Sequence, residues 1–227
     1  MNQNLKYLEK GEADNYFKRN KEKILKRNNN GQNHIVDSFK ISGISPKSIL
    51  EIGCFNGYKL DLYRKFYLKN KKKVKCFGAD LSKQAIEDGN KKYTKLNLFQ
   101  LSSMKINKLK NKFDLIICDF LYLLDRELLF EQFDLIYKCL NKDGHILISE
   151  FDPIFPHFNV NNNKKNFFSY KVDYSNFLTS SHLFIKIYSK KWTDKKNKSK
   201  YLDNDYSITL YKKINFNLSF PKNIFFD

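Results

Sequence analysis

Hydrophobic positions occur along the chain either in short continuous runs or at helical spacing. Together these two patterns predict the order of its strands and helices. Residues 48–52 form a short apolar run of β type, and glycines follow at Gly53 and Gly57. From Leu60 to Tyr67 the apolar residues then recur at helical spacing. The sequence therefore predicts a strand, a tight turn and a helix, which is the opening unit of a doubly wound α/β domain.

Further apolar runs predict the rest of a sheet. Strands are expected over residues 73–80, 97–101, 113–119 and 145–150. The fourth strand, residues 113–119, is apolar enough to be buried on both faces. Helices are expected over 82–93 and 125–140. Residues 141–144 are expected to end the second helix. Residues 181–192 and 205–214 predict an antiparallel hairpin that closes the sheet, with residues 190–200 as its charged connection.

Segments outside this sheet are candidates for covering a ligand. Residues 1–12 are polar and are expected to be mobile, and helices are predicted over 14–27 and 34–44. Residues 152–171 predict a long loop, a kind of segment that often has a function. The aromatic tail over 216–227 either packs on the domain or forms a subunit contact.

The turn has the pattern Glu51-x-Gly53-x-x-x-Gly57, without the middle glycine of a dinucleotide fold. Asp80 follows the second strand at the distance expected of an acid that binds ribose hydroxyls. With the later stretches FDLI and KDGHILISE, this order resembles the class I S-adenosylmethionine-dependent methyltransferases. An ordinary strand-to-helix turn, with Asp80 merely ending a strand, is the alternative. The resemblance implies a Rossmann-like α/β fold, a mostly parallel seven-stranded sheet, and S-adenosylmethionine as cofactor.

Two segments outside the core pattern are similar to a narrower group. Residues 11–20 match G-E-x-D-x-Y-x-x-R-N, and residues 168–175 match F-S-Y-K-x-D-Y-S. Both resemble methyltransferases of bacterial surface-sugar and flagellin glycosylation pathways of the pseudaminic acid type, although a plain amphipathic helix also explains the first. The resemblance implies an N-terminal helical lid over 1–45, a methyltransferase domain over 46–215 and a C-terminal tail over 216–227. Residues 152–174 are the expected acceptor-site insertion.

The resemblance also implies which residues contact the cofactor. Asp80 is expected at the ribose, and a serine hydroxyl or backbone group near the adenine. Arg19 is expected at the methionine carboxylate, because its planar fork can bind both oxygens. The expected cofactor-binding residues are Tyr16, Arg19, Glu51, Gly53, Cys54, Gly57, Asp80, Leu81, Ser102, Ser103 and Asp119.

Catalytic residues are less clearly indicated. Many class I enzymes have a histidine after the fourth strand, where this chain has Leu123-Leu124. The Asp-Pro-Pro-Tyr motif of amino-directed DNA methyltransferases is also missing. Asp119, His157 and Tyr170 are the candidates, with Asp152 as a further candidate base. Surface-loop packing is the alternative for His157 and Tyr170, and no metal-binding spacing is present.

Composition changes this interpretation in two places. The net charge of +18 suggests a nucleic-acid partner, but lysine supplies almost all of it, and arginine is the residue preferred for phosphate and base contacts. AT-rich coding bias is the favoured explanation. The four separated cysteines, with no apolar leader or membrane span, indicate a reduced, cytoplasmic protein without a membrane partner.

The sequence therefore predicts methyl transfer from S-adenosylmethionine to a small polar acceptor, for which a carbohydrate intermediate is one candidate. An RNA or DNA methyltransferase and a cofactor-binding module without catalysis are the alternatives. The methylated atom, the general base and the oligomeric state are left open.

Overall fold

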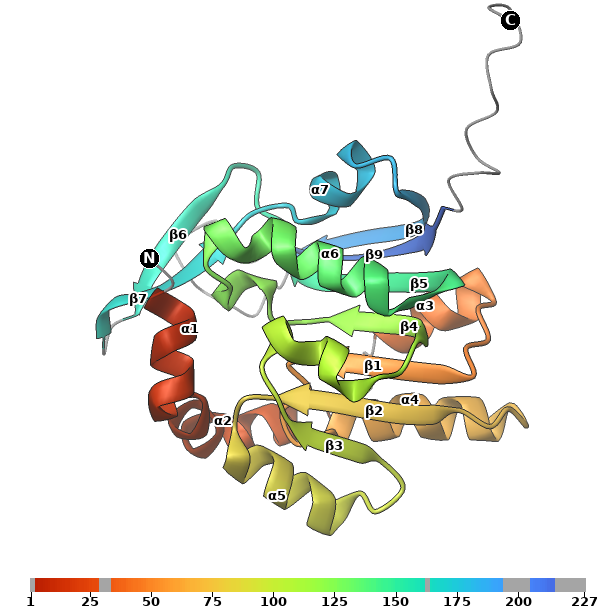
Figure 1. Cartoon of the computed structure of the whole chain (residues 1–227), viewed down its shortest axis with the longest axis horizontal. Helices are drawn as coiled ribbons and strands as arrows, with labels where there is room; N and C mark the ends of the chain where they lie inside the picture. The colour runs from red at the N-terminus through yellow and green to blue at the C-terminus, as the bar shows by residue number, and fades with distance from the viewer. Residues whose placement is uncertain (1–2, 29–33, 162–163, 194–204, 215–227) are drawn as a thin grey trace, which may run out of the picture.

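The computed structural model describes residues 3–28, 34–161, 164–193 and 205–214. Its main sheet has the strand order β3-β2-β1-β4-β5-β9-β8 (Figure 1). The first five strands are parallel, while β9 is antiparallel to both of its neighbours. The predicted Rossmann-like sheet with an antiparallel C-terminal hairpin is thus confirmed. The strands are β1 Ser48–Ile52, β2 Lys75–Asp80, β3 Asn97–Gln100, β4 Phe113–Cys118, β5 Leu140–Phe151, β8 Phe184–Thr193 and β9 Asp205–Lys213.

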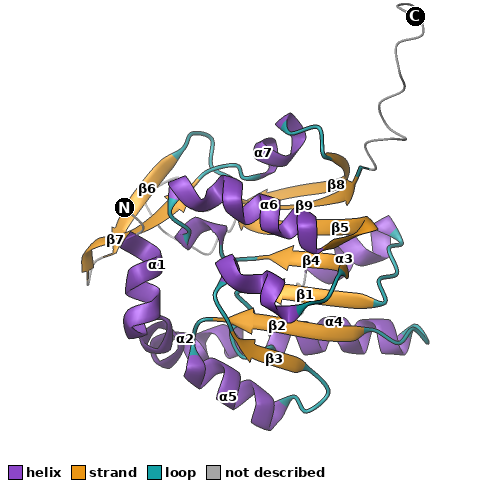
Figure 2. Cartoon of the chain, viewed as in Figure 1, coloured by secondary structure: helices purple, strands orange, loops and turns teal. Residues whose placement is uncertain are grey.

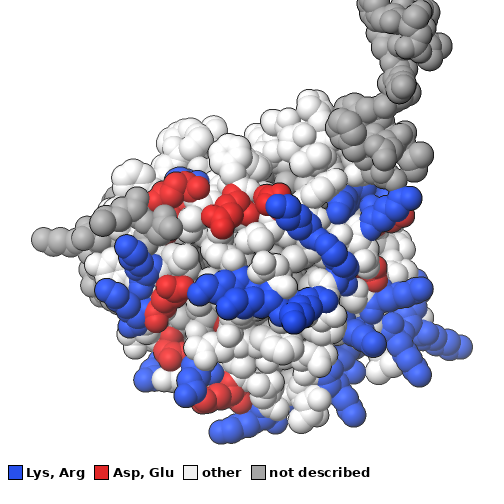
Figure 3. Space-filling view, viewed as in Figure 1, with Lys and Arg blue, Asp and Glu red and all other residues white. Residues whose placement is uncertain are grey.

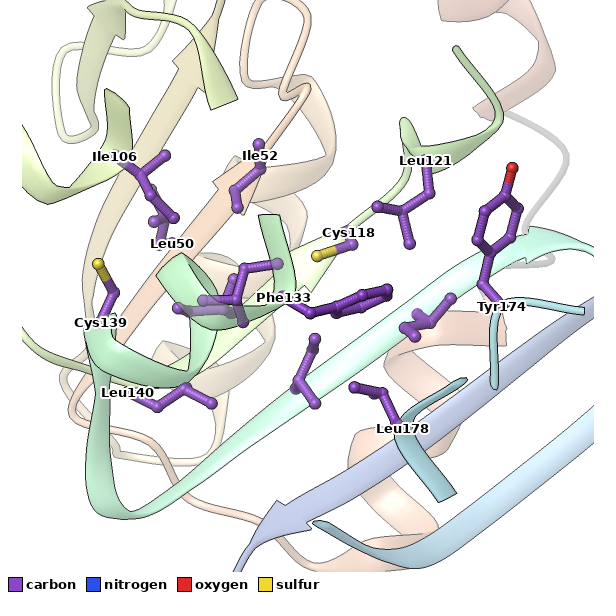
Figure 4. Packing of buried hydrophobic residues seen from close by; sticks show 14 of the residues in the cluster. Leu50, Ile52, Ile106, Cys118, Leu121, Phe133, Cys139, Leu140, Tyr174 and Leu178 are labelled. Atoms are coloured by element: carbon purple, nitrogen blue, oxygen red, sulfur yellow. The ribbon is translucent and has the colours of Figure 1, made fainter. Parts of the chain in front are cut away.

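Helices cover both faces of this sheet (Figure 2). In β4, Leu115 and Ile117 pack on one face while Ile116 and Cys118 pack on the other, and all are fully buried. Figure 4 shows the second face, where Phe133 reaches the sheet. The apolar run is therefore buried on both faces, as predicted. The first face is covered by α3 His34–Ser42, α4 Tyr58–Lys69 and α5 Lys83–Lys92, the second by η2 Ser103–Leu109, α6 Leu129–Cys139 and α7 Ser175–Ser180.

Two boundaries differ from the sequence prediction. The helix expected over 125–140 is α6 preceded by two short 3-10 turns, η3 Leu121–Leu123 and η4 Arg126–Leu128. The break expected at 141–144 lies inside β5. Phe113 already pairs with Leu140, and the register then shifts before Leu115 pairs with His145. Residues 141–144 are therefore an irregular start of the strand, because a bulge absorbs the extra residues.

The prediction that residues 1–12 are mobile is wrong for residues 3–12. They form α1 Gln3–Tyr7 and the π-helical turn η1 Leu8–Glu12, which continue into α2 Ala13–Asn28. Asn4 is completely buried and fixes this segment. Its amide Nδ2 donates to the carbonyl of Phe168 at 2.7 Å, and its Oδ1 accepts from the Phe168 backbone nitrogen at 2.9 Å. A single buried asparagine leaves no hydrophobic periodicity, so the residue pattern contains no sign of this helix.

The prediction of a long loop over 152–171 is also wrong. Most of it is an antiparallel hairpin of β6 His157–Asn161 and β7 Lys164–Lys171, which forms a separate two-stranded sheet. Phe158 pairs with Tyr170 across it, and the ring centroids of Phe158 and Phe168 lie 5.6 Å apart. Cross-strand aromatic pairs of this kind stabilise a hairpin. The many asparagines and lysines of the segment had indicated a loop.

The described part of the chain holds neither a membrane-spanning helix nor a disulfide. None of its helices is both long and apolar enough to cross a bilayer. All four cysteines are buried and unpaired. The predicted tail over 216–227 and residues 194–200 of the charged connection lie outside the described residues.

Candidate active site

A cavity of about 480 Å³ lies at the carboxyl ends of the parallel strands. Its walls include Glu51 at the end of β1, Asp80 at the end of β2, Asp119 just after β4, and Glu150 near the end of β5. Open parallel sheets bind ligands at this edge, where the strand order reverses between β1 and β4. The volume is within the range of small-molecule and cofactor sites.

The two glycines of the first turn have different tasks. Both are in the left-handed region, Gly53 with φ +74° and Gly57 with φ +80°. A Cβ on Gly53 would lie 2.8 Å from the Cβ of Phe120, a residue of the cavity wall, so Gly53 keeps the cavity open. A Cβ on Gly57 would lie 2.9 Å from Leu96 Cδ1. Gly57 therefore permits packing behind the turn and does not line the cavity.

Asp80 organises the turn and still has capacity for a ligand. Its Oδ2 accepts a hydrogen bond from the Phe55 backbone nitrogen and its Oδ1 one from the Ser82 nitrogen, both at 2.8 Å. An ionised carboxylate has about four lone-pair positions, so positions remain for hydroxyl donors in the cavity. Burial raises the pKa of Asp80 to about 6, which leaves it ionised at neutral pH.

A charged cluster lies beside the turn. Lys59, in the first turn of α4, forms an ion pair with Asp119. Burial alone would lower the pKa of Lys59, but the Asp119 carboxylate outweighs it and holds that pKa above its usual range. Glu51 is 1% exposed, and its Oε2 has no hydrogen-bond partner among the described residues. Burial raises the pKa of Glu51 to about 8, so it holds a proton at neutral pH.

Glu150 is a second buried carboxyl group in the wall, farther along the sheet edge. Its Oε1 accepts a hydrogen bond of 2.5 Å from the Leu121 backbone nitrogen. Its Oε2 is buried and, within the described chain, lacks a partner. Burial, and secondly the nearby Asp119, raises the pKa of Glu150 well above its ordinary value. Two wall residues, Glu51 and Glu150, thus each present an unsatisfied carboxyl oxygen.

The N-terminal segment closes the cavity from above the glycine turn. The Phe17 ring lies 4.8 Å and the Tyr16 ring 6.4 Å from the ring of Phe55, measured between centroids. Asp14 Oδ1 accepts hydrogen bonds from Ser82 Oγ at 2.6 Å and from the Gln84 nitrogen at 3.0 Å. The start of α2 is therefore fixed to the start of α5, directly over the turn.

The structure brings many of the predicted site residues together. Those in the cavity wall come from α2, the first two strand ends, the start of η2 and the end of β4. They are Tyr16, Glu51, Gly53, Cys54, Asp80, Leu81, Ser103 and Asp119.

Six other predicted residues lie outside the wall, among them Asp152, which forms an ion pair with Lys191 at 3.3 Å. Besides Gly57, Arg19 forms an ion pair of 2.5 Å with Glu12, and Ser102 caps η2 by accepting from the Met104 nitrogen. His157 Nδ1 lies 3.2 Å from the carbonyl oxygen of Phe155. Tyr170 stacks against Arg126, whose guanidinium carbon is 4.3 Å from the ring centroid.

Sequence reasoning missed several wall residues. Glu150 could have been found, because it ends the fifth predicted strand at the ligand-binding edge of the sheet. Lys59 could not, since a lysine in the first turn of a helix is usually a solvated side chain. Others lie in the unexpected N-terminal helices, after β1 and β4, at the end of β5 or at the start of β9: Leu5, Leu8, Phe55, Tyr58, Phe120, Tyr122, Ser149, Phe151 and Tyr206.

Comparison with known families decides the class of protein. A family model described as a methyltransferase domain matches residues 45–204, more than half of the chain. The chain belongs to this methyltransferase family. Membership confirms the predicted enzyme class, an S-adenosylmethionine-dependent methyltransferase. No curated protein gives a significant match.

Solved structures agree with this fold. TehB from Haemophilus influenzae is 17% identical, with a TM-score of 0.62 over 89% of this chain and 67% of that one. The N-methyltransferase NodS from Bradyrhizobium japonicum, in complex with S-adenosylhomocysteine, is 15% identical, with a TM-score of 0.58 over 79% and 84%. The 1,6-didemethyltoxoflavin-N1-methyltransferase of Burkholderia thailandensis is 13% identical, with a TM-score of 0.58 over 78% and 75%. At these identities the likeness concerns the fold.

Proposed function

We propose that the cavity of this methyltransferase binds S-adenosylmethionine at the Gly53 turn and transfers its methyl group to a small polar molecule. One observation supports this most strongly. The same wall contains a glycine with no room for a Cβ, an aspartate with spare acceptor positions and a glutamate with an oxygen that no described residue pairs with. These features fit the close approach, the ribose hydroxyls and the positive charge of this cofactor.

Each wall residue then has a defined part in holding the cofactor. Asp80 accepts hydrogen bonds from the ribose hydroxyls, and Leu81 and Ser103 border the adenine. Glu51 Oε2 accepts from a positively charged group of the cofactor. Lys59 holds the Asp119 carboxylate in place at the end of β4, and Tyr16 covers the methyl-donor side.

Methyl transfer requires the protein mainly to position the two reactants. The cofactor supplies a methyl group that is already activated by its sulfonium. The chain's residues bring the acceptor into line with that methyl group and exclude water, which can supply most of the rate enhancement. Leu5, Leu8 and Tyr16 form the part of the wall that shields the site.

A small acceptor is supported by the shape and charge of the chain. The N-terminal helices and the glycine turn enclose the cavity. Exposed lysines are dense at the opposite edge, where Lys71, Lys72, Lys73 and Lys75 lie at the amino end of β2 (Figure 3). A nucleic-acid enzyme would need its basic surface around the site. The similar Burkholderia enzyme, whose structure contains bound 1,6-didemethyltoxoflavin, is consistent with a small acceptor.

The carbohydrate acceptor suggested by the sequence is a narrower proposal. It rests on residues 11–20 and 168–175. The structure joins these regions to one another only indirectly, since Asn4 of the preceding helix binds Phe168. An amino sugar and a neutral sugar are both compatible with this geometry.

Cofactor binding should release a proton at pH 7. Glu51 has a pKa of about 8 in the free protein, and a positive charge beside it favours the ionised form. Calorimetric titration of the chain with S-adenosylmethionine in Tris and in phosphate should give different enthalpies at pH 7. The Glu51→Gln variant should lose most of this buffer dependence and bind about tenfold more weakly, roughly 1.4 kcal/mol. Absence of cofactor binding by the folded wild-type chain would refute the proposed function.

The lid contact should contribute more modestly. Asp14→Ala removes both hydrogen bonds to the start of α5, with an expected loss of roughly 0.5–2 kcal/mol. Because α2 then covers the turn less firmly, the dissociation rate of S-adenosylmethionine should rise severalfold in stopped-flow fluorescence. Asp37→Ala, on a partly exposed helix position that pairs with Lys40, is the matched control and should leave that rate unchanged.

A further inference from the structure

The far side of the cavity, along β5, combines an unsatisfied carboxyl group with aromatic rings. Glu150 lies there with Tyr122, Phe151 and Tyr206. We infer that the methyl acceptor presents an amine, and that Glu150 binds this amine and accepts its proton. The inference rests on the proposed function, because the cofactor must occupy the Gly53 side of the same cavity.

The position of Glu150 suits this task. The Leu121 backbone nitrogen fixes Oε1 and so sets the orientation of the whole carboxyl group. Oε2 is left as a buried oxygen without a protein donor in the described chain. A buried polar atom without a partner is costly, by about 1–3 kcal/mol. A ligand that donates a hydrogen bond removes this cost, and an ammonium group is the strongest such donor for a carboxylate.

The charges of the wall exclude the opposite kind of acceptor. The described residues of the wall include four acids, Glu51, Asp80, Asp119 and Glu150, and a single base, Lys59. Lys59 is already paired with Asp119. A phosphate or carboxylate on the acceptor would therefore meet acidic groups with no cation available among these wall residues. A hydroxyl acceptor carries no charge that the acidic wall would repel, but its hydrogen bond to Glu150 is weaker than that of a cation.

The rings beside Glu150 also favour a cation. Phe151 lies between Tyr122 and Tyr206, with centroid distances of 5.4 Å and 4.8 Å. Aromatic faces attract ammonium groups through the ring quadrupole. One face of Phe151 is already occupied by a cation, because Lys171 Nζ lies 2.8 Å from its ring centroid, so the tyrosine rings are the ones open to the acceptor. Lys171 is not part of the cavity wall, although its charge acts on Glu150.

The reaction step balances with Glu150 as the base. The ammonium group of the acceptor gives one proton to the Glu150 carboxylate and becomes a neutral amine. Its nitrogen lone pair then forms a bond to the methyl carbon as the carbon–sulfur bond breaks, and sulfur keeps that electron pair. The product is a methylated ammonium ion and S-adenosylhomocysteine, and the proton on Glu150 leaves to solvent.

The surroundings of Glu150 make it a stronger base than an exposed glutamate. Burial and the Asp119 carboxylate raise its pKa, while Lys171 and the Leu121 hydrogen bond act in the opposite direction. A bound ammonium group adds a positive charge and restores the ionised form. The carboxylate is therefore ionised when an amine is present and can hold the proton that the amine must lose.

Matched ligands test the acceptor class on the wild-type chain. We would first saturate the chain with S-adenosylhomocysteine, then titrate 2-phenylethylamine, 2-phenylethanol and 3-phenylpropanoate, and likewise glucosamine, glucose and glucuronate. The amine of at least one series should bind at least tenfold more tightly than its hydroxyl and carboxylate partners. Equal binding within both series, preference for a hydroxyl or carboxylate, or no binding by any member overturns the inference. S-adenosylhomocysteine binding in the same experiment tests the proposed function separately.

Substitution tests the residue. Glu150→Gln keeps an oxygen for the Leu121 nitrogen but cannot take a proton, so methyl transfer to the preferred amine should fall at least 100-fold in kcat. Its affinity for S-adenosylmethionine should stay within about threefold of wild type, whereas a merely structural role would lower both together with the melting temperature. Glu131→Gln, on the exposed side of α6, is the matched control and should leave all three unchanged. Unchanged kcat in Glu150→Gln overturns the role of Glu150.

Discussion

Replacement of Gly53 by valine should abolish measurable binding of S-adenosylmethionine, with an affinity loss of more than about 100-fold, or roughly 2.7 kcal/mol. The backbone at Gly53 has φ +74°, and a Cβ there would lie 2.8 Å from Phe120 Cβ and 3.6 Å from the Asp119 carbonyl. Phe120 is part of the cavity wall and cannot move away without entering the cavity or disturbing the end of β4. Calorimetry on the purified variant measures the effect directly.

Gly43 provides the control for this substitution. It has φ +67°, so a side chain is strained there too, but a Cβ would meet nothing within 4 Å. Gly43→Val should therefore lose about 1–2 kcal/mol of stability through backbone strain, measured by denaturant unfolding, and keep its cofactor affinity. If Gly43→Val and Gly53→Val lose the same affinity, backbone strain and not the contact with Phe120 explains the effect.

The main sheet was predictable because its strands are defined by burial. Leu115, Ile116 and Ile117 are apolar in succession since helices cover both faces, and a sequence shows such a run plainly. Glycine turns and strand ends then follow from the order of the elements. The cavity residues that were predicted, such as Glu51, Gly53 and Asp80, lie at these ends.

The segments that cover the edge of the sheet were harder to predict from the sequence, because polar contacts hold them in place. Asn4 holds the N-terminal helix to Phe168 and, through its backbone nitrogen, to Asp125 Oδ1 at 3.0 Å. No hydrophobic pattern accompanies such contacts. The hairpin of β6 and β7 is likewise half exposed, and Phe158 is 58% accessible, so its composition resembles that of a loop.

This difference also explains the fate of the catalytic candidates. His157 was chosen because it lies beyond a strand end, and Tyr170 because it is a polar residue of the expected acceptor-site insertion. Both choices require that the segment fold back over the sheet edge. In the hairpin, Tyr170 instead packs on Arg126 and Phe158. Asp119 and Glu150 occupy the cavity because the strands β4 and β5 carry them there. The position of a strand end is thus a more reliable guide than the chemical type of a loop residue.

Asp80→Ala should weaken S-adenosylmethionine binding by roughly 1.5–3 kcal/mol for each ribose hydrogen bond that is lost. The substitution also frees the backbone nitrogens of Phe55 and Ser82, so some loss of stability is expected. Asp114→Ala is a matched control. Asp114 Oδ2 accepts from the backbone nitrogens of Lys47 and Ser48, at 2.8 Å and 3.0 Å, at the opposite end of the sheet. Both variants should be destabilised, and only Asp80→Ala should lose cofactor affinity.

The pH dependence of the wild-type chain gives Asp80 a second signature. Because burial raises its pKa in the folded chain from 3.8 to about 6, the folded state binds this proton more tightly than the unfolded state. The contribution of Asp80 to the free energy of unfolding should therefore fall as pH rises from 3.8 to about 6. Cofactor affinity should rise over the same interval, because only the ionised carboxylate can accept from both ribose hydroxyls. Denaturant unfolding and calorimetry at matched pH values should show both trends in the difference between wild type and Asp80→Ala, because Glu51 and the other carboxyl groups titrate in both chains. An affinity difference between wild type and Asp80→Ala that stays constant between pH 5 and pH 7 would argue against the ribose contact.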